Sequence, residues 1–86
     1  MQKYLLVDGF NIIHAWPDLK QHLQKNPYYA INELAARVRV IHDVERIDLS
    51  IIYDGKGPDI QFEWPCNQKS FTLIFSPSHL SADSLI

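Results

Sequence analysis

The sequence has little of several features that would define a class of protein. Cys66 is its only cysteine, which excludes an intrachain disulfide, fits a reducing compartment and cannot form a zinc site alone. None of its three glycines belongs to a phosphate-binding loop, so a nucleotide-binding domain is a weak alternative. Asp8 interrupts the first apolar run after four residues, which is too short for a signal peptide or a membrane span. These absences predict a soluble, cytoplasmic protein with no membrane partner.

Neither sign of charge dominates the chain. Ten acidic residues against eight basic ones give a net charge of −2, so RNA or another polyanion would have to be held by local contacts or a metal ion. The hydrophobic content of 47% is that of a globular protein. A chain of 86 residues has only a thin core, which oligomerisation could supplement. We expect one small domain over residues 1–86.

Two apolar runs each end on an aspartate followed by a glycine. Tyr4 to Val7 is followed by Asp8, and Leu49 to Tyr53 is followed by Asp54. Continuous apolar runs are typical of strands that are buried on both faces, as in a parallel sheet covered by helices. Ligands of such sheets bind beyond the carboxyl ends of the strands. The two aspartates are therefore expected to share one acidic site.

The remaining pattern predicts a βαβ unit. Apolar residues three and four positions apart over residues 28–45, with Glu33 and Arg37 as an exposed ion pair, indicate the main helix. Pro17 is expected to break or redirect a short helical turn. The fold class is thus α/β, a Rossmann-like three-layer sandwich with a parallel sheet, apparently truncated after the third strand. The other expected elements are a short helix or loop at 18–26, an extended loop at 55–70, a third strand at 71–75 and a helix start at 81.

Three aspartates are the candidate catalytic and metal-binding residues. Asp8, Asp54 and Asp83 follow the first strand, the second strand and the turn after the third. Clustered carboxylates repel one another unless they hold a cation, and hard oxygen ligands suit Mg²⁺ or Mn²⁺. Asn11 could hold a ligand or orient Asp8. The alternatives are a turn-forming role for Asp54 and a helix-start charge for Asp83.

Other polar and aromatic residues could contact a substrate. Lys56 lies beside Asp54 and could meet a phosphate, or it could be simply solvated. Trp16 and Trp64 could stack on bases, although core packing or loop anchoring would explain them equally well. The four histidines have no metal-ligand spacing among them.

Three segments carry a resemblance to a known family. Residues 5–19 read Leu-Leu-Val-Asp-Gly-Phe-Asn-Ile-Ile-His-Ala-Trp-Pro-Asp-Leu, residues 51–58 read Ile-Ile-Tyr-Asp-Gly-Lys-Gly-Pro, and residues 81–83 read Ser-Ala-Asp. These strings resemble the YacP-like NYN family of bacterial ribonucleases, within the PIN-like superfamily. The resemblance implies a Rossmann-like sheet, a divalent-metal site and hydrolysis of RNA. It also implies that Asp8 and Asp83 bind metal, that Asn11 supports them and that Asp54 is a further member.

The chain resembles only about the first half of such a domain. Family members continue through a helix and a further strand that bears another acidic residue. We therefore expect a shortened form that dimerises. The resemblance does not decide whether this form is an active nuclease. The alternative is a non-catalytic module that binds RNA or protein and forms a homodimer through its exposed sheet edge. The RNA substrate, and whether a ribosome presents it, stay open.

Overall fold

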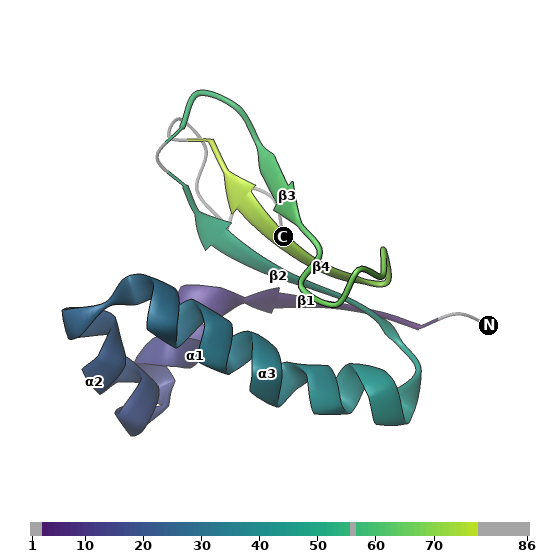
Figure 1. Ribbon diagram of the computed structural model, residues 1–86, viewed down its shortest axis with the longest axis horizontal. Helices are drawn as coiled ribbons and strands as arrows, with labels where there is room; N and C mark the ends of the chain where they lie inside the picture. Colours follow the sequence, from purple (N-terminus) through teal and green to yellow (C-terminus); the bar gives the residue numbers. More distant parts are fainter. Residues whose placement is uncertain (1–2, 56, 78–86) are drawn as a thin grey trace.

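The computed structural model describes residues 3–55 and 57–77 (Figure 1). Within these residues, one strand is followed by three helices and then by three strands. Asp83 and the helix start expected at residue 81 lie outside the described residues, as does Lys56. The elements are β1 (Tyr4–Asp8), α1 (Gly9–Ala15), α2 (Pro17–Lys25), α3 (Pro27–Glu45), β2 (Asp48–Asp54), β3 (Gln61–Glu63) and β4 (Phe71–Ser76).

The strands form one sheet in the order β1-β2-β4-β3. β1 and β4 both run parallel to β2, which confirms the predicted parallel α/β arrangement. The register sets Asp8 beside Ile52 and Asp54 beside Ser76, so the carboxyl ends of the three parallel strands meet at one edge. β3 pairs antiparallel with β4 inside the stretch expected to be an extended loop. This strand was not predicted because the glycines and prolines of this stretch indicate a loop, although Phe62 alternates with the polar Gln61 and Glu63.

Local sequence explains where the helices begin and end. Pro17 occupies the first turn of α2, where its missing N–H costs nothing, so it redirects the chain from α1 into α2. The side chain of Asn26 caps α3 by accepting a hydrogen bond from the Tyr28 N–H at 3.1 Å. α3 ends at Glu45, and its C-cap Arg46 has a left-handed φ of 52° that directs the chain back toward β2.

The core lies between the helices and one face of the sheet. Leu49, Ile51 and Tyr53 alternate along β2 and join Leu34 and Leu19 from the helices in one buried cluster. Burial of each such aliphatic side chain stabilises the fold by about 1.5–3 kcal/mol. Figure 1 shows α1, α2 and α3 together on one side of the sheet. The described residues therefore make two layers, and a second helical layer is not among them.

The helices of the described residues are not membrane-spanning. None in residues 3–55 and 57–77 is long and apolar enough to cross a bilayer.

Candidate active site at the carboxyl edge of the sheet

Asp8 is the last residue of β1 and also the N-cap of α1. One of its carboxylate oxygens accepts the Asn11 backbone N–H at 3.5 Å, and the other accepts the Asn11 side-chain amide at 2.8 Å. Asn11 thus orients Asp8, one of the two roles that the sequence predicted for it. Because a carboxylate offers about four acceptor positions, Asp8 can hold these bonds and still offer oxygen to a cation.

Asp54 ends β2, the strand next to β1, and its side chain is exposed. The next residue, Gly55, donates its N–H to the Ser76 carbonyl at 2.9 Å. A Cβ on Gly55 would lie only 2.3 Å from that carbonyl oxygen, so only glycine permits this approach. The Asp-Gly pair is therefore tied to the end of β4 and holds Asp54 at the same edge as Asp8.

An aromatic cluster centred on Tyr53 packs next to this edge. The Tyr53 ring meets Phe10 edge-on at 4.9 Å and stacks on Phe75 at 5.6 Å between ring centroids. A Cβ on Gly9 would lie 2.3 Å from the Tyr53 ring. Burial raises the pKa of the Tyr53 hydroxyl well above its ordinary value, so this residue stays protonated. Sequence reasoning missed this cluster, and the only signal was an aromatic residue directly before Asp54.

A cleft of about 380 Å³ opens beside Asp54. It lies between the start of α1, the start of α3 and the segment that leads into β3. Its wall includes aromatic rings, while acidic and amide side chains surround them. No cationic side chain is among its described lining residues. The lining includes Phe10, Tyr28, Ile31, Asp54, Asp59, Gln61, Glu63, Phe75 and Ser76.

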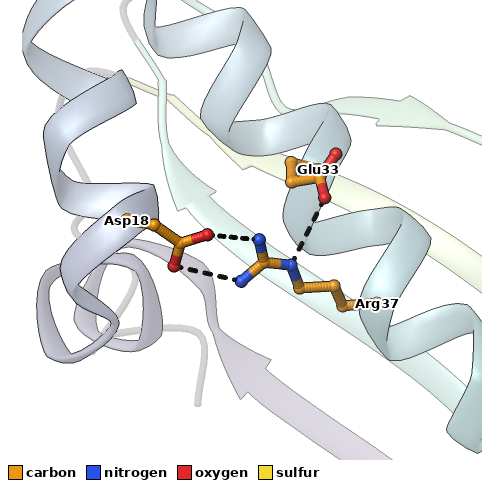
Figure 2. Close-up of polar contacts among 3 residues, drawn as sticks. All are labelled: Asp18, Glu33 and Arg37. Atoms are coloured by element: carbon orange, nitrogen blue, oxygen red, sulfur yellow. Dashed lines mark hydrogen bonds and ion pairs between the residues drawn. The ribbon is translucent and has the colours of Figure 1, made fainter.

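Arg37 is occupied by carboxylates rather than available to a substrate. Figure 2 shows its guanidinium held by both oxygens of Asp18 and by one oxygen of Glu33. The predicted pair with Glu33 is confirmed at 3.4 Å, whereas the pair with Asp18 was not expected. The hydrogen bonds from Arg37 lower the pKa of Asp18 below its ordinary value. This cluster fixes α2 against α3.

The tryptophans and the buried histidine have structural contacts. The Arg37 guanidinium lies 4.6 Å from the centroid of the Trp16 ring, so one face of Trp16 is already covered. Trp64 stacks near Phe62 at 6.2 Å. His42 is buried and its ring nitrogens bond to Asp43 at 2.9 Å and Ser70 at 2.8 Å. Each of these three side chains thus has a contact within the protein that explains its position.

The described residues supply part of a metal-binding set. In residues 3–55 and 57–77, no three histidine, cysteine, aspartate or glutamate side chains lie close enough together to hold an ion. Asp8 and Asp54 nevertheless end neighbouring strands at one edge. Proteins usually bind Mg²⁺ through one or two carboxylates and leave its other positions to water. The chemistry of this donor pair therefore fits a divalent ion.

A mostly parallel α/β sheet with carboxylates at the ends of β1 and β2 defines a Rossmann-like domain with an acidic carboxyl edge. The chain belongs to the YacP-like NYN domain family, whose model matches residues 5–86. Membership implies a relationship to the PIN-like ribonucleases, which generally use divalent metals. No curated protein and no solved structure matches the chain.

Proposed function

We propose that this chain is a metal-dependent ribonuclease domain that hydrolyses phosphodiester bonds of RNA. The observation that carries the proposal is Asp8, held in a fixed orientation by Asn11 at the edge where β2 also delivers Asp54. Family membership supports the substrate class. Asp83, which matches the family by sequence alone, completes the proposed catalytic and metal-binding set, and Lys56 meets a substrate phosphate.

The carboxylates and Asn11 have different proposed tasks. Asp8, Asp54 and Asp83 hold Mg²⁺ or Mn²⁺ through carboxylate oxygens, and Asn11 keeps Asp8 from turning away. A divalent ion held by these residues would supply Lewis-acid activation of the phosphodiester and of the attacking water. In the hydrolysis, a water oxygen forms a bond to phosphorus in line with the P–O bond that breaks. The leaving ribose oxygen takes up a proton, so atoms and charge balance.

The test is the substitution Asp8→Asn. Asparagine caps helices as well as aspartate does, so the fold is expected to survive. Removing a residue that only orients a metal ligand lowers metal affinity or activity by about 10–100-fold. Removing the ligand itself should therefore lower Mn²⁺ affinity and the rate of RNA cleavage by at least that factor. Calorimetric titration of Mn²⁺ and a cleavage assay on RNA measure the two effects.

The matched control is Glu45→Gln, which removes one exposed carboxylate at the far end of α3. It should leave Mn²⁺ binding and cleavage unchanged. Unchanged cleavage in Asp8→Asn would remove Asp8 from the mechanism and contradict the proposal.

The open edge of β1 favours a second candidate function. β1 pairs with β2 alone among the described strands, and its Tyr4, Leu5 and Leu6 side chains are 59%, 39% and 39% exposed. A non-catalytic module that forms a homodimer through this edge, and binds RNA or protein, would use this surface. RNA binding that persists in a chelator, with no cleavage when Mn²⁺ is restored, would favour this function over the nuclease.

A further inference from the structure

The cleft beside Asp54 is lined by aromatic rings and by acidic and amide side chains. Its volume of about 380 Å³ lies within the usual range of small-ligand sites. Phe10 and Phe75 form part of the wall, and both are fixed by their contacts with the buried Tyr53. Tyr28 adds a third ring that is 74% exposed. Rings of this kind stack on nucleobases regardless of sequence.

The polar groups of the cleft are mostly hydrogen-bond acceptors. Asp59 and Glu63 line it, and no ion pair among the described residues involves either of them. A phosphate would be repelled by these carboxylates, whereas a base with N–H donors would be attracted. Ser76 also lines the cleft, and its buried hydroxyl has no hydrogen-bond partner in the described part of the chain.

The donor and acceptor pattern selects among the bases. Guanine carries two adjacent N–H donors, which match a carboxylate, and a neighbouring carbonyl, which can accept from the Gln61 amide in the cleft. Uracil instead has two carbonyl groups on either side of its single N–H, and these would face Asp59 and Glu63. We propose that the cleft binds one unstacked guanine of the RNA substrate, an inference that rests on the proposed nuclease function.

This site sets which RNA is cut rather than how it is cut. Asp54 is shared between the cleft and the proposed catalytic edge, and Phe10 follows Asp8 by two positions. A guanine in the cleft thus places its own backbone at that edge. Asp8 does not line the cleft, so guanine binding and cleavage can be separated by substitution.

The experiment measures binding of nucleosides, which carry no phosphate, to the full chain without metal by ligand-observed NMR. Guanosine is expected to bind about tenfold more tightly than uridine, since a well-formed bidentate contact gives discrimination of that order. Inosine, which lacks the 2-amino group, should lie between them. Equal binding of guanosine and uridine, or no binding of either, would overturn the inference.

Two pairs of variants separate the hydrogen bonds from the stacking. The double substitution Asp59→Asn and Glu63→Gln should weaken guanosine binding about tenfold and strengthen uridine binding, because amide groups no longer repel the uracil carbonyls. Glu45→Gln should change the binding of neither nucleoside. Tyr28→Ala should weaken the binding of both nucleosides. The ring of Tyr29 lies against His22 outside the cleft, so Tyr29→Ala should weaken the binding of neither. Guanosine binding that is insensitive to the double substitution would contradict the assignment of these carboxylates.

The Asp8→Asn variant distinguishes this inference from the nuclease proposal. It should bind guanosine normally and fail to cleave RNA. Metal-dependent cleavage without guanosine binding overturns the guanine site alone. Guanosine binding in a chain that never cleaves RNA overturns the nuclease function and leaves a guanine-binding module.

Discussion

Tyr53 connects the core to the candidate active edge. Its ring is fully buried, it precedes Asp54, and it contacts the residues that follow Asp8 through Phe10 and the close approach at Gly9. Interiors are close-packed, so a small change in volume at this point is transmitted to its neighbours. The position of both strand-end carboxylates therefore depends on one aromatic side chain that does no chemistry itself.

Gly9→Ala tests this contact. Alanine usually favours a helix by about 0.5–1 kcal/mol over glycine, but here its Cβ would lie 2.3 Å from the Tyr53 ring. Overpacking of this kind costs about 1–3 kcal/mol, so the free energy of unfolding should fall by about 1–2 kcal/mol in urea titrations. Gly57→Ala is the control, because its Cβ would meet nothing closer than 3.6 Å. A Gly9→Ala protein as stable as the parent would show that Tyr53 can move.

At the scale of elements, α2 is held by one charged cluster. Arg37 on α3 binds Asp18 on α2 through two hydrogen bonds and covers Trp16 between α1 and α2. Bidentate pairs of arginine and carboxylate are the strongest of the common ion pairs. The packing of the α1–α2 segment against α3 therefore depends in part on the ionised state of Asp18.

The pH dependence of stability should reveal this pair. Because the hydrogen bonds from Arg37 lower the pKa of Asp18, the pair adds stability above the ordinary pKa of 3.8 and loses it as pH falls through the lowered value. Asp18→Asn should thus unfold at a lower temperature than the parent at neutral pH, and the difference should vanish in acid. Glu45→Gln should track the parent at every pH. A constant difference between Asp18→Asn and the parent across this range would exclude the ionic origin.

The sequence predicted the elements whose signal is local. The apolar runs at β1, β2 and β4 and the periodic pattern of α3 depend on near neighbours, and each was recognised. β3 was missed because its three exposed residues lie in a stretch whose glycines and prolines indicate a loop. The Asp18 to Arg37 pair joins residues 19 apart on different helices, which no spacing rule relates. The cleft was missed for the same reason, since its lining comes from α1, α3, β2, β3 and β4.

At the scale of the whole molecule, the described sheet has an edge strand with one unpaired side. β3 protects one edge by being short and exposed, but the other edge is β1, with no charged side chain between Tyr4 and Val7. Edge strands of soluble proteins usually carry a charge or a proline that blocks pairing. Apolar side chains on α3 are also exposed, namely Val40 at 62%, Ile41 at 47% and Val44 at 72%.

Pairing of two copies through β1 would bury this edge and supplement the thin core. We expect the protein to form a homodimer whose sedimentation coefficient rises with concentration, since association depends on mass action. Leu6→Lys places a charge on the edge and should shift the protein to a monomer that stays folded, because Leu6 is already 39% exposed. Ile60→Lys is the matched control, at an exposed position of 42% beside the opposite edge, and should still dimerise. A folded parent protein that sediments as a monomer at every concentration would contradict the homodimer. The open side of β1 would then have to pair with a different partner.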